Sequence, residues 1–399
     1  MSSQSLAEQR WSALPSTRWG RANILERVGG NALHLLACAL GSLGLAQPVL
    51  AADDGVLALM ERAADWQLAH RADLRGEHAP DGWVQGAFYA GLMALARESK
   101  SPRFHDAMMA MGEANQWRPA KRPYHADDVA VGQTYHDLYL QHRDPKMLAP
   151  TQARFDWILA HRATTPLDFD KKQNPKTQER WSWCDALFMA PPAWARMWKA
   201  TGDKRYLDFA VEEWWFTSDY LYDKEEHLYY RDSSIFAKRE DNGKKIFWSR
   251  GNGWVLGGHV RMLELLPADH PARPRFEQQF REMADKIITL QQSDGFWRAS
   301  LLAPEHYPMQ ETSGTGFHTY ALAWGLNHGL LDRAKFEGPV RRAWRALTSC
   351  VNADGKVTHV QPVGFTPVTF DADHSEPFGV GAFLLAGSEI LKLKPANNP

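Results

Sequence analysis

The chain has 399 residues, of which 44% are hydrophobic and 12% aromatic, so it can bury a large core. Its formal net charge of -1 at pH 7 provides no general attraction to nucleic acid or to an anionic membrane surface. Seventeen tryptophans are many for this length. Most belong to a core, but we expect some to line a groove, where flat indole faces suit the apolar faces of sugar rings.

Residues 1–52 have the pattern of a secretory signal peptide. A basic segment precedes the apolar stretch 32–45, and small residues follow directly before Asp53. The apolar stretch is too short to span a membrane. We therefore predict that 1–52 is removed and that the mature protein is exported to the periplasm, without membrane contact. The cysteines that then remain, Cys184 and Cys350, form no disulfide framework and no metal-binding pattern.

Two alternating kinds of helix are predicted from Asp53 onward. One kind is rich in Gly, Ala and aromatic residues, and these helices should begin near Gly82, Asp128, Pro191, Asn252, Gly314 and Phe378. The other kind is more charged and has one solvated face. These helices are expected at Gly55–His70, Arg103–Trp117, Pro145–His161, Asp203–Ser218, Arg275–Gln292 and Phe336–Val351. The recurrence of such pairs predicts stacked helical hairpins.

Six inner and six outer helices indicate an all-α (α/α)6 barrel. Because no Ser/Gly-rich linker interrupts residues 53–399, we predict one catalytic domain over this range. The strand-like segments His227–Arg231 and Lys244–Trp248 are expected to form a small β element at the rim. The inner helices run in one direction, so the turns that lead into them should converge on one mouth.

Asp185 is the candidate catalytic acid. It lies between two tryptophans, Trp181 and Trp183, and an apolar run. Apolar surroundings disfavour the charged form of a carboxyl group, and a protonated acid beside aromatic faces suits sugar chemistry. The alternative is a helix N-cap, although a cap needs no aromatic neighbours.

Asp127 and Asp128 offer a second carboxylate in the matching turn of the repeat. Two carboxylates that share a site raise the pKa of one of them, which creates a paired acid and base. One of the two would cap its helix and the other would face Asp185. The sequence does not decide which is which.

Further lead-in turns supply candidate substrate-binding residues. Arg250 carries a forked cation that can hold a carboxylate by two hydrogen bonds, or can support loops internally. Thr312 could donate its hydroxyl to a sugar or belong to a helix cap. The complete set of candidates is Trp83, Trp183, Arg231, Arg250, Trp254 and Thr312.

Metal and cofactor chemistry are not indicated. The 16 histidines show no His-x-x-x-His or Glu-paired spacing typical of zinc. His125 could touch a ligand, but a single histidine more often belongs to a core or a rim. No Gly-rich phosphate loop and no nucleophile elbow is present. We therefore predict no metal and no cofactor.

Five segments carry a family resemblance, namely 127–133, 183–192, 248–254, 311–317 and 379–387. In these segments the chain resembles the unsaturated rhamnogalacturonyl hydrolases of glycoside hydrolase family 105. It is also similar, less closely, to the unsaturated glucuronyl hydrolases of family 88. The resemblance extends from about residue 80 to residue 393, and the segments are highly specific when taken together.

The resemblance implies an (α/α)6 barrel and a reaction on oligosaccharides left by polysaccharide lyases, whose non-reducing end is a 4,5-unsaturated uronic acid. An aspartic acid protonates C4 of the enol ether, and water adds at C5. The resulting hemiketal rearranges and releases the rest of the oligosaccharide. No metal or organic cofactor takes part.

The same resemblance implies roles for individual residues. Asp185 is implied as the general acid and then as the base for water, with Asp127 or Asp128 as its partner. Trp183, Arg250 and Trp254 are implied as sugar-binding residues. Many relatives have a histidine in the segment where this chain has Arg231, which leaves the sugar next to the uronic acid undetermined.

Two other functions also fit the residues. One is an inverting glycosidase on the same barrel, with two carboxylates set apart to admit water. The other is a non-catalytic periplasmic sugar-binding protein with a tryptophan-lined mouth. The parent polysaccharide, the oligomeric state and the true start codon are not determined by the sequence.

Overall fold

The fold is described from a computed structural model of the chain, over residues 53–70 and 75–393. The predicted signal peptide, 1–52, lies outside these residues. The signal peptide, the export that it implies and the domain boundary after residue 52 therefore stay predictions.

Helices alternate along the chain between an inner and an outer set. The inner helices are α2 (Trp83–Glu98), α4 (Gly132–His142), α7 (Pro191–Thr201), α9 (Ser249–Leu263), α11 (Thr312–Asn327) and α13 (Pro377–Ile390). The outer helices are α1 (Asp53–Ala69), α3 (Arg103–Ala114), α5 (Ala149–Ala160), α8 (Lys204–Leu221), α10 (Arg273–Thr289) and α12 (Arg333–Ser349). A short helix, α6 (Ala186–Met189), precedes α7. Every residue of α9 and α13 is buried, whereas α10 and α12 bury one face only.

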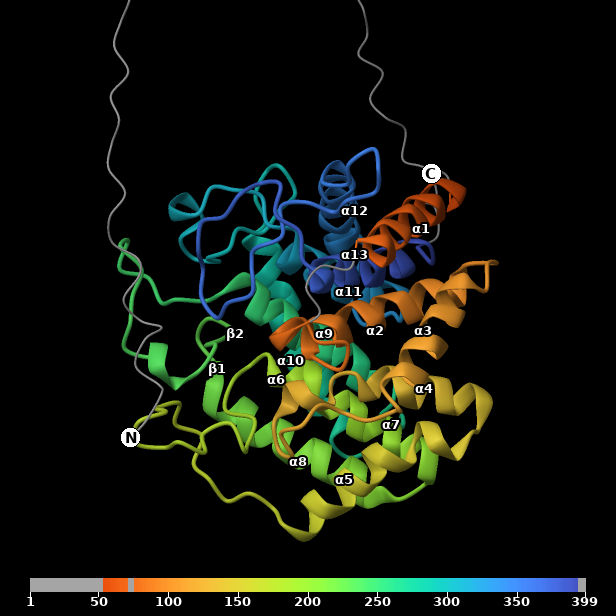
Figure 1. The fold of residues 1–399 in the computed structure, drawn as a ribbon. Helices are drawn as coiled ribbons and strands as arrows, with labels where there is room; N and C mark the ends of the chain where they lie inside the picture. The colour runs from red at the N-terminus through yellow and green to blue at the C-terminus, as the bar shows by residue number, and fades with distance from the viewer. Residues whose placement is uncertain (1–52, 71–74, 394–399) are drawn as a thin grey trace, which may run out of the picture. The chain divides into compact units, whose positions relative to one another are not determined.

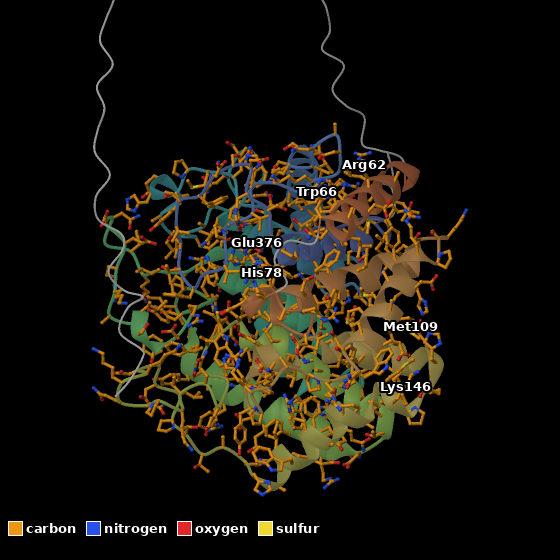
Figure 2. All side chains as sticks on the ribbon, in the orientation of Figure 1. Arg62, Trp66, His78, Met109, Lys146 and Glu376 are labelled. Atoms are coloured by element: carbon orange, nitrogen blue, oxygen red, sulfur yellow. The ribbon has the colours of Figure 1, made fainter. Side chains whose placement is uncertain are left out.

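The inner helices form a closed ring. Each contacts the next along the chain, from α2 through α4, α7, α9 and α11 to α13, and α13 returns to α2 (Figure 1). His78 and Glu376, which lie just before α2 and α13, form a hydrogen bond of 2.7 Å across this closure (Figure 2). The ring of hairpins confirms the predicted (α/α)6 barrel.

Glycines allow the first and last inner helices to touch. A Cβ atom at Gly91 of α2 would lie 2.4 Å from the carbonyl oxygen of Gly381, and one at Gly381 would lie 2.4 Å from that of Ala87. Neither position accepts a larger residue without separating α2 from α13. The Gly/Ala-rich composition of the inner helices therefore allows the ring to close.

The rim contains less regular strand than predicted. Strands β1 (Tyr222–Asp223) and β2 (Leu228–Tyr229) form an antiparallel hairpin, so part of the predicted segment His227–Arg231 is a strand. The predicted strand Lys244–Trp248 is wrong, because its ends make only isolated bridges to two different segments, Arg239↔Lys245 and Trp248↔Ser300.

Helix starts differ from the prediction at two places that matter for the site. Asp127 and Asp128 lie in a separate 3₁₀ helix, Ala126–Val129, and α4 begins only at Gly132. Helix α9 begins at Ser249, so Arg250 lies inside its first turn and does not precede the helix. Within residues 53–70 and 75–393, no helix is long and apolar enough to cross a membrane.

Candidate active site

A cavity of about 480 Å³ collects side chains from the turns that lead into the inner helices. Five predicted site residues line it, namely Trp83, Asp127, Trp183, Asp185 and Arg231. The other four predicted residues, Asp128, Arg250, Trp254 and Thr312, do not line it. Position in the repeat therefore predicted the cavity correctly, but it did not distinguish lining residues from those behind them.

Asp185 lies at the cavity, directly before α6, and its side chain makes no capping hydrogen bond. Asp185 therefore occupies the N-cap position of α6, but its carboxylate does not cap the helix. Burial raises the pKa of the Asp185 carboxyl group, and the nearby positive charge of Arg231 opposes this shift. The thiol of Cys184 lies 3.5 Å from Oδ2 and donates to it. Asp185 is thus an acid in a sheltered place beside one cation.

Asp127 and Asp128 are neighbours with opposite environments. Asp127 lines the cavity, and burial together with the charge of Asp185 raises its pKa to about 8. Asp128 is turned away and accepts hydrogen bonds from Arg122, at 2.9 Å from Nε and 2.6 Å from the backbone nitrogen. The structure therefore brings Asp127 to the same cavity as Asp185, whereas Asp128 is paired with Arg122 outside the lining.

His125, which the sequence named only as a histidine that could touch a ligand, lines the cavity. Its Nδ1 accepts a hydrogen bond from the backbone N–H of Asp127 at 3.3 Å, so the ring proton belongs on Nε2. Nε2 is buried, Gln178 is its polar neighbour, and burial lowers the His125 pKa to about 4. The ring is therefore neutral. It lies 4.8 Å from the Trp183 ring.

Arg231 presents a cation to the cavity next to the acid. Its Nε lies 3.6 Å from Oδ2 of Asp185, and its Nη1 donates to Asp232 at 2.6 Å. The backbone carbonyl of Arg231 accepts from the N–H of Cys184 at 2.8 Å, which fixes this segment against the one that carries Asp185. Nε is buried without a hydrogen-bond partner.

Arg250, the expected carboxylate ligand, is fully buried and supports a loop. Its Nη1 donates to the carbonyl of Gln361 at 2.7 Å, and its Nη2 donates to that of Pro362 at 2.8 Å. The guanidinium lies between the rings of Trp248 and Phe378, at 4.5 and 4.7 Å. The structure corrects the expectation, since both terminal nitrogens donate to backbone carbonyls, and favours the alternative of internal support.

Trp254 and Thr312 were expected to bind substrate, but both are buried and do not line the cavity. Trp254 is fully buried, with its ring 4.2 Å from that of Phe317 and 6.1 Å from that of Trp83. Thr312 is buried, and its hydroxyl donates to the carbonyl of Thr358 at 2.7 Å. Trp254 thus lies behind Trp83, which itself lines the cavity.

The remaining lining comes from loops that carry no repeat pattern. Phe169, Lys171 and Gln178 lie between α5 and α6, and the segment 363–365 lies between α12 and α13. Only tertiary structure brings them to the cavity, because nothing in their local sequence predicts it. Within residues 53–70 and 75–393, no group of three or more His, Cys, Asp or Glu side chains could hold a metal ion.

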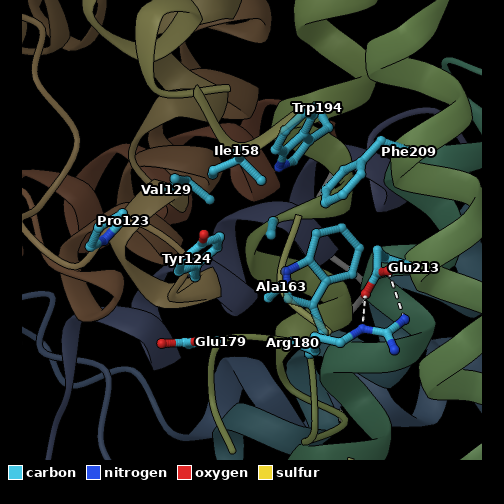
Figure 3. Close-up of a pocket in the computed structure, with 12 residues that line it drawn as sticks. Pro123, Tyr124, Val129, Ile158, Ala163, Glu179, Arg180, Trp194, Phe209 and Glu213 are labelled. Carbon is cyan, nitrogen blue, oxygen red and sulfur yellow. Dashed lines mark hydrogen bonds and ion pairs between the residues drawn. The ribbon is translucent and has the colours of Figure 1, made fainter. Parts of the chain in front are cut away.

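A second cavity, between α5, α7 and α8, does not have the properties of an active site (Figure 3). It measures about 20 Å³, and most of its lining is apolar or aromatic. Arg180 donates to both carboxylate oxygens of Glu213, at 3.0 and 2.7 Å (Figure 3). These two charges compensate each other, and the third charged lining residue, Glu179, lies 3.6 Å from Nζ of Lys176, so each charged group of this cavity has an opposite charge beside it.

Comparisons with known proteins show which family the chain resembles. The sequence model of Glycosyl Hydrolase Family 88 matches residues 59–394. The chain is 42% identical over 345 residues to an "Unsaturated 3S-rhamnoglycuronyl hydrolase" of Formosa agariphila, covering 84% of this chain and 90% of that protein. It is 38% identical over 352 residues to a protein of the same name from an Alteromonas species, covering 83% and 84%.

Among solved structures, the fold matches "Glycosyl hydrolase family 88 from Bacteroides vulgatus". The TM-score is 0.76 at 30% identity, and the match covers 86% of this chain and 99% of that one. The family match spans most of the chain, and the relatives align over most of their own length. The chain therefore belongs to glycosyl hydrolase family 88.

Proposed function

We propose that the protein removes a 4,5-unsaturated uronic acid from the non-reducing end of lyase-generated oligosaccharides. The observation that carries this proposal is the arrangement of Asp185, Asp127 and Arg231, two carboxyl groups of raised pKa and one forked cation along one cavity. The names of the two curated relatives support rhamnose as the sugar that follows the uronic acid.

Arg231 binds the carboxylate of the uronic acid in this proposal. That carboxylate is attached to C5, and the carbon to be protonated is the adjacent C4. Because Nε of Arg231 lies 3.6 Å from Oδ2 of Asp185, a carboxylate on Arg231 brings the C4=C5 bond next to the acid. The aromatic faces of Trp83 and Trp183, which line the same cavity, flank the sugar ring.

Asp185 then transfers its proton to C4. The electron pair of the double bond forms the new C4–H bond, and the positive charge at C5 is shared with the ring oxygen. Water adds to C5, and the ionised Asp185 takes up the proton that this water loses. The hemiketal at C5 opens to a ketone, which leaves a hemiacetal at C1. The hemiacetal expels the rest of the oligosaccharide as an alcohol.

Substrate binding itself controls the proton on Asp185. In the free protein, the charge of Arg231 is the largest influence that lowers the Asp185 pKa. A bound carboxylate compensates that charge and raises the pKa of Asp185 again. Asp127, with a pKa of about 8, is protonated at neutral pH and can donate a hydrogen bond to the substrate.

The test uses two disaccharides that differ only in the 4,5-double bond. The proposal expects cleavage of the unsaturated disaccharide, with loss of the ultraviolet absorbance of its double bond, and no cleavage of the saturated one. An inverting glycosidase attacks the anomeric carbon and does not need the double bond, so it would cleave both. Binding of the unsaturated disaccharide without cleavage would instead indicate a sugar-binding protein.

A further inference from the structure

Helix α6 ends in two carbonyl groups that the residues following it do not bond. The helix has 4 residues and leads through two prolines into α7. Because proline has no backbone N–H, Pro192 cannot donate to the carbonyl of Phe188, its partner in a regular helix. The N–H of Ala193, which would serve Met189, donates instead to the carbonyl of Ala190 at 2.9 Å. Both carbonyls therefore depend on a donor from another element.

The side-chain amide of Gln133 supplies that donor. Gln133 is buried near the start of α4. Its Nε2 donates to the carbonyl of Phe188 at 2.8 Å and to that of Met189 at 3.2 Å. Its Oε1 accepts from Nε of Arg261, in α9, at 2.6 Å. One amide group therefore connects α4, α6 and α9, and both of its hydrogens are used on α6.

Asp185 lies between two points at which the chain is fixed. Before it, the N–H of Cys184 donates to the carbonyl of Arg231 at 2.8 Å. After it, α6 contacts α9 closely, since a Cβ atom at Gly258 would lie 2.5 Å from the carbonyl oxygen of Leu187. Because α6 is about one helical turn, a shift of its last carbonyls also moves its first residue and the acid directly before it.

We propose that Gln133 is a positioning residue for Asp185, because its amide fixes α6 and thereby the place of the acid beside the bound sugar. The inference rests on the proposed function, in which Asp185 transfers a proton to C4. Gln133 does not line the cavity, so it acts on the reaction only through α6. A displacement of the acid by about 1 Å slows proton transfer strongly and leaves the other substrate contacts in place. The effect therefore belongs to kcat and not to KM.

Two variants of Gln133 test this role. Gln133→Met keeps the length of the side chain and removes both hydrogens. It should lower kcat on an unsaturated disaccharide about 10- to 100-fold and change KM less than about twofold. Gln133→Glu keeps the shape and an oxygen toward Arg261, but its carboxylate cannot donate, so kcat should fall by a similar factor. Hydrogen exchange over residues 186–190 should be faster in both variants than in the wild type.

His136→Phe is the matched control. His136 is also buried in α4, and its Nδ1 donates to the carbonyl of Ala193, in α7, at 3.0 Å. The variant therefore removes a buried donor between two inner helices but leaves the bonds to α6 intact. It should lower Tm and keep the kcat and KM of the wild type.

Wild-type kcat in both Gln133 variants would overturn the positioning role. An equal loss of kcat in His136→Phe would overturn it as well, because the loss would then follow from destabilisation in general. Absence of turnover by the wild-type protein would instead remove the proposed function. Faster exchange in the Gln133 variants would in that case still show that Gln133 fixes α6.

Discussion

Arg231 and Arg250 are both arginines expected to bind substrate, yet their surroundings give them different tasks. Arg231 follows a short hairpin and lines the cavity, with its Nε 3.6 Å from Oδ2 of Asp185. Arg250 lies in the first turn of α9 beneath the loop at Gln361, and its terminal nitrogens donate to two backbone carbonyls. A forked cation binds whichever oxygens face it, so the surrounding backbone decides between ligand binding and loop support.

The largest effect is expected at Asp185, which both arginines influence. Asp185→Asn removes the transferable proton and should lower kcat about 10²- to 10⁴-fold, the range of general acid catalysis. Substrate affinity should change little, because asparagine has nearly the same shape. Steady-state rates and equilibrium binding of an unsaturated disaccharide measure the two quantities. The matched control Asp208→Asn, at an exposed position of α8, should behave as the wild type. Full turnover by Asp185→Asn would exclude it as the acid.

The two arginines themselves give the next largest effects, in different measurements. Arg231→Met should lower kcat/KM about 30- to 1000-fold, mainly through KM, because the uronate loses a charged partner worth about 2–4 kcal/mol. Arg250→Met should instead lower the free energy of unfolding by about 2–4 kcal/mol, since two carbonyls lose their donors. Kinetics and denaturant unfolding of both variants separate the roles. A binding defect in stably folded Arg250→Met as large as that of Arg231→Met would contradict the comparison.

The pH dependence sharpens the assignment of the carboxyl pair. The folded-state pKa of Asp127 is raised to about 8, so the folded protein holds a proton that the unfolded chain loses near pH 4. This contribution to stability is complete below pH 4 and is lost as the pH rises through 8. Asp127→Asn should therefore unfold less readily than the wild type above pH 8, by about 1–3 kcal/mol. Thermal unfolding at pH 5 and pH 9 tests this, and a stability difference that does not depend on pH would contradict it.

The smallest effect is expected at Thr312, which lies outside the cavity. Thr312→Val removes the hydrogen bond to the carbonyl of Thr358 and should lower the free energy of unfolding by about 0.5–1.5 kcal/mol. Its kcat and KM should equal those of the wild type. Thr312→Ser, which keeps the hydroxyl, serves as the control. A KM that rises in Thr312→Val but not in Thr312→Ser would contradict this prediction, because it would show that the hydroxyl contacts the substrate.

The barrel and the position of its mouth follow from the sequence. Alternating Gly/Ala-rich and charged helices bury different fractions of their surface, so composition alone separates inner from outer. The same repeat places Trp83, Asp127, Trp183 and Asp185 in equivalent turns, and these four residues line the cavity.

Tertiary structure alone decided which polar groups are free. Asp127 and Asp128 are adjacent in sequence. In the folded chain Arg122 compensates the charge of Asp128, whereas Asp127 lines the cavity. The same holds for Arg250, whose partners at Gln361 and Pro362 lie more than a hundred residues away. Hydrogen-bond partners and burial are properties of the folded chain, because they depend on backbone groups that local sequence does not place.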